Sequence, residues 1–258
     1  MLLVYRLCFF HILSINEERN YQLCQNMKKI DARKVQILKL IVEEYIRTGD
    51  ITGSKFLLKK YDLQVSSATI RNDMAALEKM GLIFQPYNSA GRLPTTRGIR
   101  VFVDYLMEHM PAMFIEGEQE IREIMDVSHI DDTLYTLVSR LTKITGEITF
   151  ACIPSLGTSY YLGLSSFLEK NTLLIGTEVY NIIKVLENKY HFIDLLQDLD
   201  VGEKVSVFIG EENIIPDLES CTMIVKRIDI EGKIGYLGVL GSLKMDYAFN
   251  IAAMRNVL

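Results

Sequence analysis

Residue types that mark several protein classes are scarce in this chain. Its 258 residues include no tryptophan, five prolines and four cysteines, and the cysteines are far apart in the sequence. Without close cysteine pairs, neither a disulfide framework nor a Cys-x-x-Cys zinc site is predicted, and a reducing compartment is expected. Without a proline-rich or glycine-rich run, no long linker or low-complexity segment is predicted either.

Motifs of catalysis and cofactor binding are also missing. The four histidines are dispersed and form no His-x-x-x-His pair. The sequence contains no G-x-S-x-G, no phosphate-binding P-loop and no G-x-G-x-x-G. We therefore expect a protein that is not an enzyme and that holds no cofactor and no metal.

The first 26 residues differ from the rest. Residues 1–13 are almost all apolar, but this run is too short to span a bilayer and is followed by no clear cleavage site of a signal peptide. We interpret residues 1–26 as a start assigned too early, with Met27 as the true beginning. A flexible arm and an apolar helix packed on the body are the alternatives, and no membrane association is expected.

Charge is distributed unevenly along the chain. The overall formal charge is −5, yet residues 27–110 carry 14 lysines and arginines against 9 aspartates and glutamates. Residues 111–258 carry 12 against 22. Nucleic-acid binding depends on a local basic surface and not on the overall charge. The candidates for phosphate neutralisation are Lys55, Lys59, Lys60, Arg71, Lys79, Arg92, Arg97 and Arg100.

The segment after Met27 has the pattern of a helix-turn-helix. Apolar residues recur at helical spacing over residues 32–48, and Gly49 follows as a stop signal. Residues 54–61 predict a second, short helix, and residues 62–64 a tight turn. A third helix is expected over residues 66–80. This order is that of helix-turn-helix proteins, in which the last helix contacts DNA.

The third helix has two different faces. Ser66 is its expected N-cap and Gly81 its expected end. One arc of the helix is apolar and predicts packing on a small core. The opposite face is small, polar and basic, which suits a DNA groove, although an ordinary surface helix has the same pattern. The apolar arc comprises Ile70, Met74 and Leu77, and the outward face comprises Ala68, Asn72, Ala75, Ala76 and Lys79, flanked by Thr69 and Arg71.

Residues 82–94 are expected to form a wing. Residues 82–85 predict a strand, and residues 86–94 a loop of turn-forming residues with Arg92 at its tip. An arginine there can reach a phosphate or a narrow minor groove, whereas a solvated surface charge is the alternative. The predicted DNA-binding residues are Ser66, Ser67, Ala68, Thr69, Arg71, Asn72, Lys79, Ser89, Arg92, Thr95 and Arg97.

Several blocks of sequence at both ends of the chain form a recognisable series. They are residues 37–39 and 44–46, Thr48-Gly49-Asp50, Gly53-Ser54, residues 66–74, Ser89-Ala90-Gly91-Arg92, Pro94-Thr95, residues 208–213 and residues 238–247. Together, and in this order, they resemble one family, the bacterial heat-inducible transcription repressors called HrcA.

The resemblance implies a cytoplasmic, dimeric repressor that binds double-stranded DNA at a palindromic operator upstream of chaperone genes. It also implies a GAF-like domain with an inserted dimerisation domain, and a chaperonin that keeps the repressor active until heat diverts it to unfolded clients. This sequence resembles a shortened member, because the central insertion is largely missing between residues 160–167 and 179–199. Ser242 replaces the family's usual proline and Lys244 its usual arginine.

The sequence beyond Gly146 changes to short apolar runs that predict a sheet. Helices on an antiparallel sheet make an α+β domain. Glu211, Glu212 and Asn213 are either ligand groups or a polar loop at the end of a strand. The expected strands are residues 148–153, 160–167, 173–178, 205–209, 223–230 and 234–240, with a hairpin turn at residues 231–233 and helices at residues 97–110, 118–125, 133–145 and 181–199.

We therefore predict an α+β protein in which an N-terminal winged helix-turn-helix precedes a GAF-like antiparallel-sheet domain. Residues 27–110 would form the DNA-binding domain with its linker helix, and residues 111–258 the regulatory and dimerisation domain. The expected function is repression of heat-shock chaperone genes by a dimer bound to an inverted repeat. The alternatives are a winged-helix module that binds protein instead of DNA and a ligand-sensing regulator of other genes.

Overall fold

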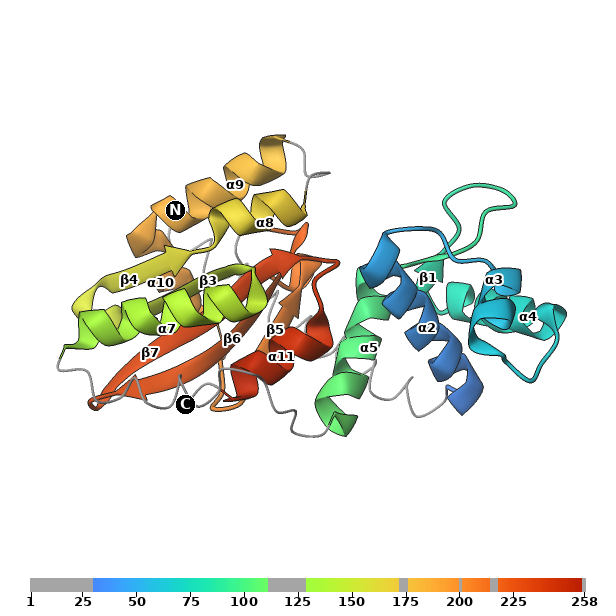
Figure 1. Cartoon of the computed structure of the whole chain (residues 1–258), viewed down its shortest axis with the longest axis horizontal. Coiled ribbons are helices and arrows are strands. Elements are labelled where there is room, and N and C mark those ends of the chain that lie inside the picture. Colours follow the sequence, from blue (N-terminus) through green and yellow to red (C-terminus); the bar gives the residue numbers. More distant parts are fainter. Residues whose placement is uncertain (1–29, 111–128, 172–175, 200, 214–217, 257–258) are drawn as a thin grey trace, which may run out of the picture. The chain divides into compact units, whose positions relative to one another are not determined.

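The structure is a computed structural model in which the chain divides into two compact units, Met1–Asp104 and Tyr105–Leu258. Figure 1 shows both units, which are described separately below. Within the described residues, none of the helices has the length and apolarity needed to cross a membrane. The start segment 1–26 and the expected helix at residues 118–125 lie outside these residues, which are 30–110, 129–171, 176–199, 201–213 and 218–256.

The first unit contains the three predicted helices and a two-stranded sheet. Each helix begins or ends at a residue that the sequence marks. Asp31 accepts a hydrogen bond from the backbone N–H of Arg33 at the start of the first helix, and Gly49 ends that helix at a φ of 74°. The elements are α2 (Ala32–Thr48), α3 (Ser54–Tyr61), α4 (Ser67–Lys79), β1 (Ile83–Phe84), β2 (Leu93–Pro94) and α5 (Thr96–His109), whose last residues, from Tyr105 on, belong to the second unit.

The strands β1 and β2 pair antiparallel and complete a winged helix-turn-helix arrangement. Side chains from α2, α3, α4 and α5 are fully buried, which gives this small unit an apolar core. The expected helix over residues 97–110 is present as α5, and Thr95 caps it by accepting a hydrogen bond from the N–H of Gly98 at 3.0 Å. The core residues include Ile37, Leu38, Ile41, Leu57, Ile70, Leu77 and Ile99.

A buried carboxylate joins α2 to the end of α3. The side chain of Glu44 is 4% exposed and accepts hydrogen bonds from Lys60 and Tyr61, and from Arg47 at 2.6 Å. Burial raises the pKa of this carboxyl, but the three donors outweigh that effect and lower the pKa to about 2. Glu44 is therefore ionised at neutral pH and fixes the position of α3 against α2.

The second unit is built on a five-stranded antiparallel sheet. Its order is β4-β3-β7-β6-β5, so the first strand in sequence lies next to the last. The hairpin between β6 and β7 is the predicted one, with Glu231 and Gly232 at φ values of 53° and 76°. The strands are β3 (Ile148–Ile153), β4 (Thr158–Leu162), β5 (Ser206–Ile209), β6 (Cys221–Ile230) and β7 (Lys233–Ser242).

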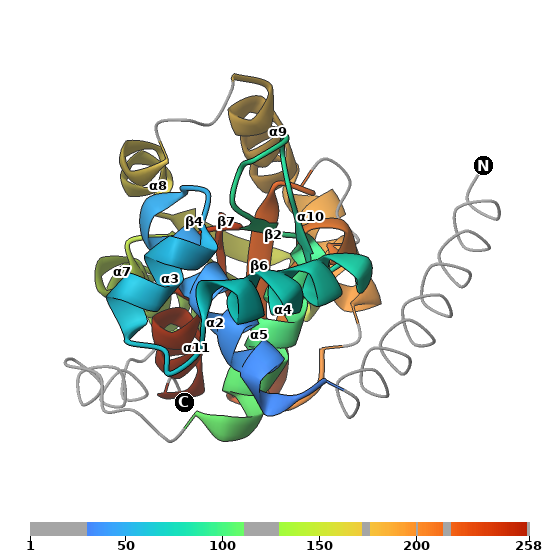
Figure 2. The same ribbon diagram turned by 90° about the vertical axis from the view of Figure 1, so that its right-hand side faces the viewer.

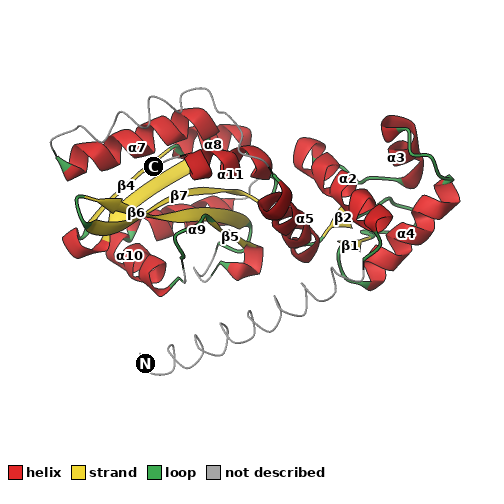
Figure 3. Ribbon diagram, turned by 90° about the horizontal axis from the view of Figure 1, so that it is seen from below, coloured by secondary structure: helices red, strands yellow, loops and turns green. Residues whose placement is uncertain are grey.

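Helices cover both faces of this sheet, as Figure 3 shows. One face carries α7 and α11, and the other carries α9 and α10. Phe167 of α8 is buried in the same core cluster as residues of α9 and α10. This is the GAF-like α+β arrangement that the sequence predicts. The helices are α7 (Ile130–Thr145), α8 (Leu164–Lys170), α9 (Gly176–Glu187), α10 (Lys189–Asp198) and α11 (Tyr247–Asn256).

Three predictions in this unit were wrong in detail. The expected strand at 160–167 ends at Leu162, because Gly163 adopts a left-handed φ of 97° and α8 follows. The expected strand at 173–178 is wrong in its described part, because Gly176 begins α9. The expected helix at 181–199 is two helices, separated at Asn188. Short apolar runs do not distinguish a strand from a buried helix, which explains the first two errors.

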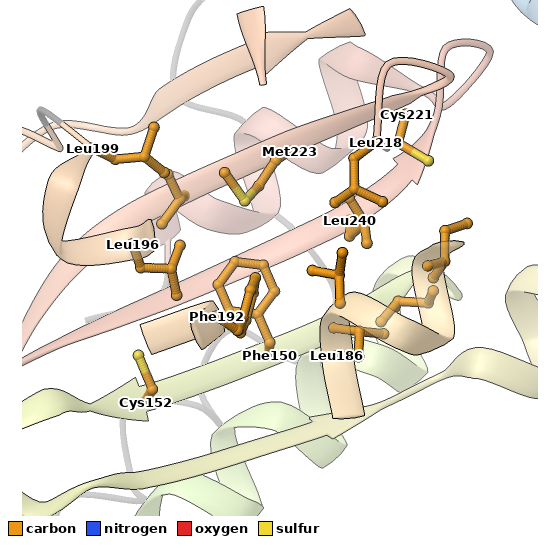
Figure 4. Close-up of a cluster of buried hydrophobic side chains, with 14 of the residues drawn as sticks. Phe150, Cys152, Leu186, Phe192, Leu196, Leu199, Leu218, Cys221, Met223 and Leu240 are labelled. Atoms are coloured by element: carbon orange, nitrogen blue, oxygen red, sulfur yellow. The ribbon is translucent and has the colours of Figure 1, made fainter. Parts of the chain in front are cut away.

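One hydrophobic core cluster of the second unit lies between the sheet and helices α8, α9 and α10 (Figure 4). The rings of Phe150 and Phe192 meet edge to face with centroids 5.0 Å apart. Burial raises the pKa of Cys152 to about 12 and that of Cys221 to about 11, so both thiols stay protonated at neutral pH. These two cysteines are free and buried in the core.

We predict that Glu44→Gln destabilises the first unit at neutral pH by roughly 1–3 kcal/mol, because an amide cannot replace a carboxylate with three donors. Since the folded pKa of Glu44 lies below its ordinary value of 4.5, its stabilising effect is present above pH 4.5 and disappears as the pH falls toward 2. Chemical denaturation between pH 3 and pH 7 measures both effects.

The neighbouring half-exposed residue Glu43 supplies the matched control. Glu43→Gln is expected to change the free energy of unfolding by no more than about 0.5 kcal/mol at neutral pH. Equal unfolding free energies for the two variants at neutral pH would contradict the role given to Glu44.

Candidate nucleic-acid interface

Helix α4, which Figure 2 shows in front of α2, buries its apolar arc and exposes residues on the opposite face. Ile70 and Leu77 are fully buried and Met74 is 3% exposed, which confirms the predicted packing face. A residue that the pattern did not single out, Asp73, is also buried on this side. Its carboxylate accepts hydrogen bonds from Nε and Nη2 of Arg33 in α2, at 2.7 and 3.2 Å. This ion pair fixes the rotation of α4 about its axis.

The outward face of α4 carries a basic and an amide side chain near its first turns. Arg71, Asn72 and Lys79 are exposed, and none of the hydrogen bonds or ion pairs among the described residues engages their side chains. Ala68 and Ala75 are exposed between them, so no bulky side chain blocks approach to the face. Asparagine can read adenine in the major groove through two hydrogen bonds, and arginine can bind guanine or a phosphate.

The first turn of α4 is tied to α3 and to itself. Ser66 accepts a hydrogen bond from the N–H of Thr69 at 3.0 Å, and the two hydroxyls lie 2.9 Å apart. The hydroxyl of Ser67 lies 3.1 Å from that of Ser54 at the start of α3. Ser67 therefore joins the two helices, while the exposed end of α4 retains the backbone N–H groups that favour a phosphate.

The wing is the loop between β1 and β2, and it projects beyond the body of the unit, as Figure 1 shows. The chain reverses over residues 87–90, where the N–H of Ala90 donates to the carbonyl of Tyr87 at 3.1 Å and Ser89 has a φ of 65°. Tyr87, Asn88 and Ser89 are exposed there, and Tyr87 is 65% exposed.

Arg92 lies at the base of the wing, so its predicted place at the tip was wrong. Its backbone forms two hydrogen bonds with Thr52, at 2.8 and 3.0 Å. Its side chain is 16% exposed and donates through Nη2 and Nε to the carboxylate of Glu78 in α4, at 2.8 and 3.1 Å. Arg92 thus joins the wing to α4. A pairing with Thr52, far away in sequence, carries no local signal, which is why the loop pattern misplaced Arg92.

Gly91 allows this close approach. A Cβ at Gly91 would overlap the backbone carbonyl of Thr52, so any other residue would push the wing away from the segment that precedes α3. The glycine next to Arg92 therefore has a steric role, and the wing is held to the helices by backbone bonds on one side and an ion pair on the other.

The remaining predicted residues divide into exposed and engaged side chains. Arg97 is exposed, whereas the hydroxyl of Thr95 donates to the carbonyl of Gly81 at 2.7 Å and also caps α5. Thr95 therefore has a structural role at the end of the wing. Two further basic candidates, Lys60 and Arg100, are paired with Glu44 and Asp104, while Lys55 and Lys59 on α3 are exposed.

The sequence reasoning did not select the wing residues Tyr87 and Asn88. The signal available in the sequence for these two residues was an aromatic and an amide residue among the turn-forming residues after Pro86. In the second unit, Glu212 accepts a hydrogen bond from the N–H of Ile209, and the buried amide of Asn213 donates to three backbone carbonyls. These two side chains hold the loop after β5. No group of three potential metal ligands occurs among the described residues.

Comparisons with known proteins show which family this chain resembles. Residues 115–251, more than half of the chain, match the family model described as the HrcA protein C terminal domain. A solved structure described as "Crystal structure of a hypothetical protein at 2.2 A resolution" superposes with a TM-score of 0.70 at 19% identity. It covers 90% of this chain and 96% of its own, and it supports the fold alone.

Three curated relatives carry the name heat-inducible transcription repressor HrcA. That of Carboxydothermus hydrogenoformans is 27% identical over 327 aligned positions, covering 87% of this chain and 95% of the relative. Because 327 positions exceed the 258 residues of this chain, the alignment includes segments that this chain lacks. The relatives from Acidothermus cellulolyticus and Clostridium perfringens are 31% and 47% identical, over 73% and 45% of this chain.

These last two matches span 57% and 36% of the relatives' own lengths. The family-model match covers the second unit, and the matching relatives share one name. The chain belongs to the HrcA family.

Proposed function

We propose that this protein is a transcription repressor of heat-shock chaperone genes that binds a palindromic operator in double-stranded DNA as a homodimer. The observation that carries the proposal is the outward face of α4, where Arg71 and Asn72 are exposed while Asp73 on the opposite side holds the helix in place. The family name supports repression of heat-induced genes. A repressor of bacterial genes acts in the cytoplasm, where the chromosome lies.

In this proposal α4 enters the major groove and the wing follows the adjacent backbone. Asn72 and Arg71 would contact base edges or phosphates near the start of α4, and Lys79 a phosphate near its end. Ser66, Ala68 and Thr69 would lie at the groove, with Ser89 at the wing tip and Arg97 at the start of α5.

Exposed apolar side chains support a second candidate, in which the winged helix docks a protein. Phe56, Phe84 and Met80 are 45%, 42% and 39% exposed in this unit. An apolar surface of this kind favours a protein partner, whereas phosphate binding needs the basic residues around it. DNA binding and its salt dependence distinguish the two candidates.

We predict that Asn72→Ala weakens binding to a palindromic promoter fragment by about 5- to 150-fold, because one bidentate base contact corresponds to roughly 1–3 kcal/mol. Arg71→Ala is expected to weaken binding and, if it contacts a phosphate, to reduce the slope of log affinity against log salt by about one. Gel shifts at several salt concentrations, with circular dichroism to check folding, measure this.

The matched control is Lys204→Ala, which removes an exposed positive charge from the second unit. Its affinity is expected to equal that of the unchanged protein. If Arg71→Ala, Asn72→Ala and Lys204→Ala all retain full affinity, the proposed role of α4 is wrong.

The ion pair at the wing base gives a separate prediction. Both Arg92→Ala and Glu78→Ala remove this pair, but only Arg92→Ala also removes a positive charge. Because the guanidinium of Arg92 is largely buried against Glu78, we expect both variants to loosen the wing and to lower DNA affinity by similar factors. A much larger loss for Arg92→Ala than for Glu78→Ala would instead assign a direct DNA contact to Arg92.

The gene target and the chaperonin partner are tested together by footprinting. We expect protection of an inverted repeat at the organism's chaperone-operon promoters, and stronger protection when its chaperonin is added. Protection that does not change with chaperonin would retain the repressor and remove the chaperonin from the proposal. Absence of protection at every chaperone promoter would overturn the gene target.

A further inference from the structure

One of the two outer strands of the five-stranded sheet, β4, has an unusual edge. β4 pairs with β3 on one side, and no strand among the described residues pairs with its other side. Its sequence, Thr-Ser-Tyr-Tyr-Leu, has neither a charge nor a proline. Natural edge strands commonly carry a lysine, a proline or a bulge that prevents pairing with another chain. β4 lacks these devices, and half of its backbone groups point away from β3.

Exposed aromatic side chains lie on both sides of this edge. On the face that carries α7, the ring of Tyr135 meets that of Tyr160 with centroids 6.2 Å apart, and Tyr135 is 52% exposed. On the other face, Tyr161 is 37% exposed and Tyr190 of α10 is 73% exposed. Such tyrosines are enriched where protein surfaces meet.

We propose that this edge binds the same edge of a second copy of the chain, with β4 antiparallel to β4 across a two-fold axis at Tyr160. This deepens the proposed function, on which it rests for the requirement of a dimer, because a palindromic operator calls for a two-fold protein. The pairing would join the two five-stranded sheets into one continuous sheet.

Helix spacing supports a two-fold axis at this place. Strands in a sheet lie about 4.8 Å apart. Helix α7 contacts both β3 and β4, so its axis lies over the space between them. Pairing β4 with its copy would therefore place the two α7 axes about 10 Å apart on the same face, within the range at which helices pack. The helices would meet through Tyr135 on each copy.

Charge also favours a second copy. The first turn of α7 carries Asp131 and Asp132, and its last turn carries Lys143. The two-fold axis makes the helices antiparallel, so the acidic first turn of each points in the direction of the basic last turn of the other. Burial and the neighbouring carboxylate of Asp131 raise the pKa of the Tyr160 phenol, so Asp131 lies close to that side chain. Residues 111–258 carry 12 lysines and arginines against 22 aspartates and glutamates, whereas β4 itself carries no charge.

Cysteine crosslinking tests the register. In the full chain with Cys8→Ser and Cys24→Ser, Tyr160→Cys is expected to form a disulfide-linked dimer under mild oxidation, because a residue at a two-fold axis faces its own copy. The matched control, Tyr180→Cys, places a cysteine at another exposed tyrosine, on α9, and is expected to stay monomeric on a non-reducing gel. Failure of single cysteines at every position from 158 to 162 to crosslink would overturn the proposal.

A second measurement does not depend on cysteine chemistry. Sedimentation of the protein with Ser159→Lys and Tyr161→Lys is expected to show at least a tenfold weaker dimer, with an unchanged circular dichroism spectrum. An unchanged dimer would overturn the β4 interface. A monomer whose β4 amides are still protected from hydrogen exchange would also overturn it, since another part of the same chain would then cover the edge.

The outcomes separate this inference from the proposed function. A dimer that is crosslinked at position 160 but binds no promoter fragment would support the β4 interface and contradict the repressor function. A dimer that binds the operator but forms no crosslink in β4 would support the repressor function and contradict the β4 interface.

Discussion

The burial of one face of α4 is the constraint on which the first unit depends. Ile70 and Leu77 leave water completely, and each such side chain contributes roughly 1.5–3 kcal/mol. Because the helix has one apolar arc, this burial exposes the opposite face with Arg71 and Asn72. The Arg33–Asp73 pair then fixes the rotation of the helix. The orientation of the candidate DNA-binding side chains is thus a consequence of core packing.

Basic residues in this unit divide into two groups that composition alone does not separate. One group pairs with a carboxylate inside the unit, as Lys60 does with Glu44 and Arg92 with Glu78. The other group, which includes Arg71, is exposed and available to phosphates. Net positive charge over residues 27–110 therefore overstates the number of cations that can neutralise DNA. At the base of the wing Arg92 binds Glu78 of α4, and at the tip Tyr87 and its neighbours are exposed.

The second unit combines a neutral sheet edge with a strongly acidic surface. One core cluster lies between the sheet and α8, α9 and α10, and α7 with α11 covers the opposite face. The outer edge of β4 has no strand partner among the described residues. If two copies join there, the symmetry that a palindromic operator requires originates in backbone pairing, which depends little on side-chain identity. A shortened family member would need no additional domain for that purpose.

Local signals in the sequence predicted the helices of the first unit, the β6–β7 hairpin and the outward position of Asn72, because helical period, caps and turn residues act over a few positions. The buried pair of Asp73 with Arg33 and the attachment of Arg92 to Thr52 and Glu78 depend on residues 14 to 40 positions apart. Tertiary packing decides which residues distant in sequence become neighbours. A polar side chain has a structural role where packing places a partner beside it, and it stays exposed where packing does not. The sequence by itself therefore determined which helix face is the candidate for DNA binding, and the tertiary structure decided which of the basic side chains there are exposed, because pairing with a carboxylate depends on residues that packing brings together.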